Sequence, residues 1–104
     1  MAIGTKRRTH GGYILVKVAY GNKNWRPEHV LIMEEAIGRR LRRAEQVHHI
    51  NGIKDDNGIE NLHLFPDTKT HIAAERSCAD VVREFLHSGQ VSFNRESGIY
   101  QRLL

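Results

Sequence analysis

Histidines and asparagines at fixed spacing are the part of this sequence that could do chemistry. The segment Val47-His48-His49-Ile50-Asn51-Gly52 is followed by Asn57-Gly58-Ile59-Glu60-Asn61-Leu62 and then by His71. Imidazole can exchange a proton near neutral pH, and it is also a common metal ligand. These residue types therefore predict acid–base chemistry beside a bound metal ion.

Local signals predict the elements that must position these side chains. Asn-Gly pairs mark a loop between two short runs of β-type residues, and Pro66 ends the second run. Asp67 can cap the N–H groups of a helix that follows. The prediction is a strand at 46–50, a loop at 51–58, a strand at 61–65 and a helix from 68 to about 87.

The two adjacent histidines cannot act in the same way. Successive side chains of a strand leave opposite faces, so His48 and His49 could hardly chelate one ion together on an ideal strand. At a strand end, however, one can face an ion while the other faces a substrate. His71 lies just after a predicted helix start, where backbone N–H groups and the helix dipole favour an anion such as phosphate.

The flanking segments carry weaker signals. Residues 1–12 are basic and are expected to be loose, and Tyr13–Val18 is predicted as a strand because it is rich in β-branched residues. A helix is expected from Pro27 to a stop at Gly38. In the last predicted helix four apolar residues are expected to pack inward, and residues 90–104 give no clear pattern. These four residues are Cys78, Val81, Val82 and Phe85.

Composition narrows the class of protein. The 104 residues carry 16 Lys+Arg against 12 Asp+Glu, and the basic residues gather at Lys6-Arg7-Arg8 and around 39–43. Such clusters suit a polyanion, although solvated surface is the alternative interpretation. One cysteine excludes an internal disulfide, and the apolar runs are too short to span a membrane. With no secretory leader at its start, the chain is expected in the cytoplasm.

The histidine–asparagine pattern resembles the HNH endonuclease family, which has a ββα-metal fold. His-His-Ile-Asn-Gly, then Asp-Asn-Gly-Ile-Glu-Asn-Leu, then a helix bearing His is similar to the short single-domain HNH proteins frequent in bacteriophages and prophages. The resemblance continues upstream through Glu28–Glu35 and Gly38, and it covers roughly residues 12–75.

The resemblance implies a role for each of four residues. It makes His49 the general base, and it makes His48 and His71 the protein ligands of one divalent metal ion. Asn61 is the residue that braces the loop between the strands. His48 stands where many relatives have Asp. Mg²⁺ or Mn²⁺ is the expected ion. Zn²⁺ and Ni²⁺ are the alternatives, because neutral nitrogen ligands suit these softer ions better than they suit Mg²⁺.

The predicted fold is α+β, with an N-terminal strand or hairpin and a helix followed by a ββα-metal unit. We expect one HNH nuclease domain over 1–104: a loose basic segment at 1–12, a strand and helix at 13–45, the ββα unit at 46–88 and an extension at 89–104. The predicted function is nicking or cutting of DNA with weak sequence preference. Four arginines are expected to contact DNA phosphates: Arg39, Arg40, Arg42 and Arg43.

Two other functions fit the same residues. One is a non-catalytic, metal-stabilised DNA-binding module. The other is an accessory of a phage DNA-packaging machine that acts only with a terminase. The sequence leaves open whether the protein is a monomer or a homodimer.

Overall fold

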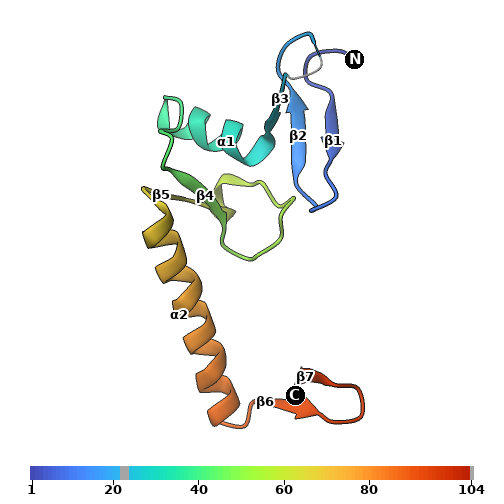
Figure 1. The fold of residues 1–104 in the computed structure, drawn as a ribbon, viewed down its shortest axis with the longest axis vertical. Helices are drawn as coiled ribbons and strands as arrows, with labels where there is room; N and C mark the ends of the chain where they lie inside the picture. The colour runs from blue at the N-terminus through green and yellow to red at the C-terminus, as the bar shows by residue number, and fades with distance from the viewer. Residues whose placement is uncertain (22–23, 104) are drawn as a thin grey trace. The chain divides into compact units, whose positions relative to one another are not determined.

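A three-stranded antiparallel sheet opens the chain in the computed structural model, which describes residues 1–21 and 24–103. Its strands are β1 (Lys6–Arg8), β2 (Ile14–Lys17) and β3 (Trp25–Pro27), in the order β1-β2-β3 (Figure 1). The expectation of a loose N-terminus is wrong for residues 6–8. They pair with β2, and the Arg7 guanidinium lies 4.4 Å from the centroid of the Trp25 ring.

Helix α1 (Glu28–Ile37) follows at once, as the sequence predicts. Pro27 stands at its N-cap position with extended backbone, which suits a residue that has no N–H to donate. Gly38 ends the helix in the left-handed conformation, with a φ of 74°, and its N–H donates to the Glu34 carbonyl. The helix contacts β2, β3 and the hairpin that comes next, so it joins the two sheets of this region.

The hairpin consists of β4 (Gln46–His49) and β5 (Leu62–Phe65), which confirms the predicted strand–loop–strand order. A short 3-10 helix, η1 (Ile59–Asn61), precedes β5. Asn61 therefore lies in η1 and not at the start of the strand. The register pairs His49 with Leu62 and His48 with His63.

The interior around α1 and the hairpin is unusually polar. Among the described residues, the buried apolar side chains are Met33 and Leu62, whereas four polar residues are buried to a similar degree. These four are Lys17, His49, Asn57 and Asn61. Buried polar groups need hydrogen-bond partners, so this interior depends on hydrogen bonds as well as on apolar contact.

The chain divides into two compact units, Met1–Thr68 and Lys69–Leu104, and each is described by itself. The division falls inside the segment 46–88, so the expectation of a single HNH domain stays a prediction. Helix α2 (Thr68–His87) begins and ends where the sequence predicts it. Beyond it, β6 (Val91–Asn94) and β7 (Ile99–Arg102) form an antiparallel hairpin in the segment without a clear sequence pattern.

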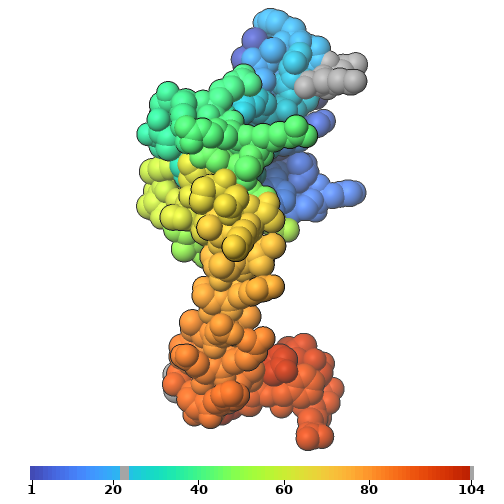
Figure 2. Space-filling model, turned by 60° about the vertical axis from the view of Figure 1, so that its left-hand side comes forward, coloured from blue at the N-terminus to red at the C-terminus, as the bar shows by residue number. Residues whose placement is uncertain are grey.

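The expectation that four apolar residues of α2 pack inward is wrong. Cys78 is exposed, and Val81, Val82 and Phe85 keep between 44% and 49% of their surface exposed. The orange atoms of α2 lie at the surface in Figure 2. The physical reason is that one helix and one two-stranded hairpin offer too little apolar surface to enclose a helix face. Within the described ranges, no helix is both long and apolar enough to cross a membrane.

Candidate active site

His49 is the last residue of β4, and only 7% of its surface is exposed. Its Nε2 atom lies 2.7 Å from Asn57 Oδ1, within hydrogen-bond distance. Asn57 is equally buried and comes from the loop between β4 and β5. The Asn57 amide therefore holds the orientation of the imidazole that the sequence predicts as a general base.

Two aromatic rings pack against this imidazole. The centroid of the His29 ring lies 4.9 Å from that of His49 in an edge-on arrangement, and the Tyr13 centroid lies 6.1 Å away. Burial, together with the nearby His49, lowers the pKa of His29 to about 4. His29 is consequently neutral near pH 7 and adds no positive charge beside His49.

Asn61 braces the loop, as its predicted role requires. Its Oδ1 accepts a hydrogen bond from the Asn51 backbone N–H at 3.0 Å. Its Nδ2 donates to Asn51 Oδ1 at 2.9 Å and to the Asp56 carbonyl at 2.8 Å. These bonds tie Asn51 and Asp56 to η1, just before β5, and thereby fix the loop that carries Asn57.

His48 occupies the other face of the hairpin. Its ring centroid lies 5.5 Å from that of Phe65, and its cross-strand neighbour is His63. The two adjacent histidines thus leave β4 on opposite sides, as strand geometry demands. β4 ends at His49. The two histidines therefore lie at a strand end, where one can face an ion while the other faces a substrate.

His71 lies in the first turn of α2, in the second unit. Its Nε2 atom lies 3.4 Å from Glu75 Oε1, one helical turn along. An imidazole and a carboxylate at this spacing form a donor pair that divalent ions accept. His48 belongs to the first unit, so the pairing of His48 and His71 at one ion stays a prediction.

The connection between α1 and β4, residues 38–45, is rich in arginine, and its arginines differ in their contacts. Arg39 forms a two-point ion pair with Glu45, at 2.7 and 2.9 Å, which lowers the pKa of Glu45 to about 2. The backbone N–H of Arg42 donates to the same carboxylate. Arg39 thus helps to hold the connection in shape, although it is exposed, as are Arg40, Arg42 and Arg43.

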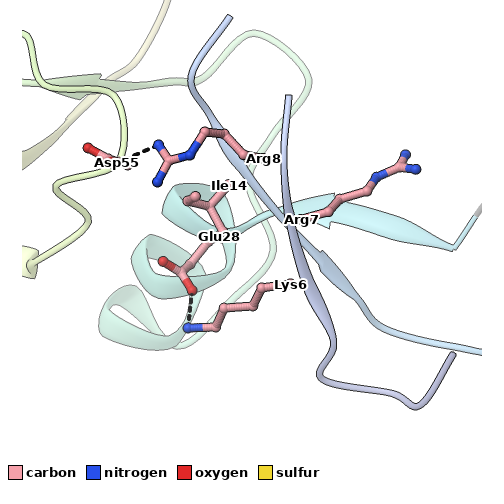
Figure 3. Close-up of a pocket in the computed structure, with 6 residues that line it drawn as sticks. All are labelled: Lys6, Arg7, Arg8, Ile14, Glu28 and Asp55. Carbon is pink, nitrogen blue, oxygen red and sulfur yellow. Dashed lines mark hydrogen bonds and ion pairs between the residues drawn. The ribbon is translucent and has the colours of Figure 1, made fainter. Parts of the chain in front are cut away.

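Sequence reasoning missed Glu28. Its carboxylate accepts from Asn57 Nδ2 at 2.9 Å and pairs with Lys6 Nζ at 2.5 Å, and these two contacts lower its pKa. Figure 3 shows the Lys6 contact, together with the ion pair between Arg8 and Asp55. Asn57 lies in the predicted loop, but its side-chain bonds reach α1 and β4. A polar residue at the first position of a helix gives no signal of such a contact.

The fold and the site define an α+β protein with a buried histidine at the end of a hairpin whose loop is braced by asparagine. Residues 26–72 match the family model described as HNH endonuclease, and this match supports the HNH endonuclease family for that segment. The match includes both histidines of β4, Asn61 and His71. No curated protein and no solved structure matches the chain. The family assignment indicates a nuclease-type protein that acts on DNA.

Proposed function

We propose that this protein is a metal-dependent DNA endonuclease in which His49 activates the attacking water. The observation that carries the proposal is the state of His49, a buried imidazole held by Asn57 at the end of a strand in a segment of the HNH family. Any buried imidazole needs a hydrogen-bond partner, so the match to the HNH family is what favours a catalytic role over a packing role.

His49 would act as a general base. A neutral imidazole can take a proton from water near pH 7, which makes the water oxygen a better nucleophile. That oxygen forms a new bond to phosphorus and the bond from phosphorus to the 3′ oxygen breaks. The proton passes to His49, and the departing oxygen takes one from solvent. The family resemblance implies 3′-hydroxyl and 5′-phosphate ends.

His48 and His71 would hold one divalent ion. The donor chemistry fits such an ion, because both are imidazoles and His71 has the Glu75 carboxylate within 3.4 Å. When bound, the ion would neutralise charge that builds up on the phosphate oxygens. Mg²⁺, Mn²⁺, Zn²⁺ and Ni²⁺ are the ions to be tested.

The exposed arginines of the connection would grip the DNA backbone. Arg40, Arg42 and Arg43 lie in the segment just before the strand that carries His48 and His49. Contacts to phosphate give affinity without reading bases. Because phosphate contacts carry no sequence information, we propose weak sequence preference.

Cleavage of supercoiled plasmid with each of these ions tests the proposal. We expect nicked or linear DNA with at least one ion and none with chelator. His49→Ala should abolish cleavage while the ion still raises the melting temperature, because a general base is not an ion ligand. DNA binding without cleavage under every ion would overturn the proposal and leave the non-catalytic binding module in its place.

A further inference from the structure

A chain of polar contacts runs from the first strand to His49. Lys6 Nζ pairs with Glu28 Oε2 at 2.5 Å, and Glu28 Oε1 accepts from Asn57 Nδ2 at 2.9 Å. Asn57 Oδ1 then lies 2.7 Å from His49 Nε2. These contacts thus link four segments of the first unit: β1, the start of α1, the loop after β4 and the end of β4, which carries the imidazole.

The inner residues of this series of contacts have little access to water. His49 and Asn57 are each 7% exposed, and the Glu28 side chain is 16% exposed. A polar group at such a site loses stability if its protein partner is removed, because water cannot easily replace that partner. The direction of each hydrogen bond is therefore set by the neighbouring groups and not by solvent.

The donor and acceptor of each hydrogen bond can be assigned step by step from Glu28 to His49. The hydrogen bonds from Asn57 and from Lys6 lower the pKa of Glu28, so its carboxylate is ionised near neutral pH and can only accept. The Asn57 amide must then turn its nitrogen to Glu28 and its oxygen to His49. An amide oxygen also only accepts, so His49 Nε2 must carry the hydrogen. The lone pair of the neutral ring is left on Nδ1.

We propose that Glu28 is a positioning residue that acts through Asn57 to hold His49 in the Nε2–H tautomer, with Nδ1 as the atom that accepts the proton of the attacking water. The role in catalysis rests on the proposed nuclease function, whereas the tautomer is a property of the protein alone. In a neutral imidazole, one ring nitrogen donates and the other accepts, and the bond at one nitrogen decides the state of the other.

A purely structural role for Asn57 would predict a different set of contacts. The loop is already held by Asn61, which makes three side-chain hydrogen bonds to Asn51 and Asp56. The two side-chain bonds of Asn57 leave the loop altogether, one for Glu28 and the other for His49. The two asparagines therefore have different roles: Asn61 holds the loop, and Asn57 holds the imidazole.

The test uses the full chain without metal and the ¹⁵N chemical shifts of its imidazoles, measured at alkaline pH where the rings are neutral. In the wild type we expect His49 to carry its hydrogen on Nε2. Glu28→Gln is nearly isosteric, but the introduced amide can both donate and accept, so Asn57 is free to turn over. We expect the His49 shifts to move toward the other tautomer, while Glu35→Gln, an exposed change on the same helix, leaves them in place.

A compensating pair of changes makes the test specific. In the double variant Glu28→Gln/Asn57→Asp, the introduced glutamine can donate to the introduced aspartate, which can only accept from His49. The pair should restore the Nε2–H tautomer that Glu28→Gln loses. Unchanged His49 shifts in Glu28→Gln, or a double variant that stays in the altered state, would overturn the proposal. Urea unfolding shows whether each variant is folded when its spectrum is recorded.

Single-turnover cleavage connects the tautomer with the reaction. We expect Glu28→Gln to lower the rate at saturating DNA about tenfold, equal to about 1.4 kcal/mol of barrier, and the double variant to recover most of it. DNA affinity should stay within twofold for both. If wild-type protein shows the expected tautomer but cuts no DNA with any ion, the proposed nuclease function fails and the positioning of His49 stands. A tautomer that responds as expected while the rate does not would overturn the catalytic role of Glu28.

Discussion

Replacing Asn61 by alanine removes three side-chain hydrogen bonds that hold the loop between β4 and β5. The lost bonds join Asn61 to the Asn51 backbone N–H, to the Asn51 side chain and to the Asp56 carbonyl. Asn61 is 8% exposed, so the substitution also leaves a small gap where the amide was. We expect a clear loss of stability together with a looser loop around Asn57.

The magnitude follows from the bonds and from their surroundings. A hydrogen bond contributes about 1 kcal/mol net, so three bonds correspond to about 3 kcal/mol. Asn51 is exposed and Asp56 is half-buried, which lets water replace part of what is lost. We therefore expect Asn61→Ala to lower the free energy of unfolding by about 2–3 kcal/mol. For a protein of this size that is a large part of the total.

Urea unfolding followed by tryptophan fluorescence measures this effect. Trp25 is the single tryptophan and lies in β3, so the signal reports on the first unit, which also contains Asn61. Asn61→Asp is the matched variant, because it keeps an acceptor for the Asn51 N–H but cannot donate to the two oxygens. It should be at least as destabilising as alanine. A loss below about 0.5 kcal/mol for either variant would refute the bracing role, because surface substitutions have effects of that size.

Three further predictions concern metal, DNA and pH. Removing either proposed ligand, by His48→Ala or His71→Ala, should shrink the rise in melting temperature that a divalent ion gives, as measured by thermal unfolding with and without chelator. Replacing Arg40 and Arg43 by glutamine should flatten the salt dependence of DNA binding by about 0.9 per lost phosphate contact, with unrelated sequences weakened equally. The pKa of His29 is about 4 in the fold against 6.5 for the free side chain, so the unfolded chain takes up the proton first as the pH falls. The free energy of unfolding should therefore drop by about 1–2 kcal/mol between about pH 6.5 and 4, after discounting for the partial exposure of the ring, and His29→Phe should remove that drop.

The elements that position the site could be predicted from the sequence because their signals are local. Pro27 and Gly38 mark the ends of α1, and Pro66 separates β5 from α2, which begins at Thr68. The strand at Lys6–Arg8 could not be predicted in this way. Three consecutive basic residues show no alternation, and the pairing with β2 is a contact between segments.

The burial of α2 could not be predicted for a related reason. Helical spacing shows that Cys78, Val81 and Phe85 share a region of the helix surface, but it does not show whether anything covers them. Among the described residues, those beyond the helix form a two-stranded hairpin, and these side chains remain exposed. A periodic pattern predicts a face, whereas burial depends on the amount of chain available to cover it.

Within the candidate site, the sequence pattern pointed to His49 and Asn61, whose roles stay predictions, and it gave no sign of the partners of His49. Asn61 was predicted to brace the loop, and its three hydrogen bonds agree with that role. Glu28 precedes Asn57 by 29 positions, and the contact between them exists only because α1 packs against the hairpin. Side-chain contacts of this range leave no trace in spacing or composition.

Stability and site geometry depend on the same hydrogen bonds in the first unit. Among the described residues, the buried apolar side chains are Met33 and Leu62. The hydrogen bonds of the buried polar side chains therefore take over part of the stabilising role that a larger apolar core has in other proteins. Asn57 and Asn61 can be exchanged for apolar residues only by leaving His49 or the loop without a partner. An apolar replacement that raised stability would therefore be expected to release the imidazole. For this reason the energetic role of Asn61 and the positioning role of Glu28 have to be measured by separate readouts, unfolding for the first and the His49 tautomer for the second.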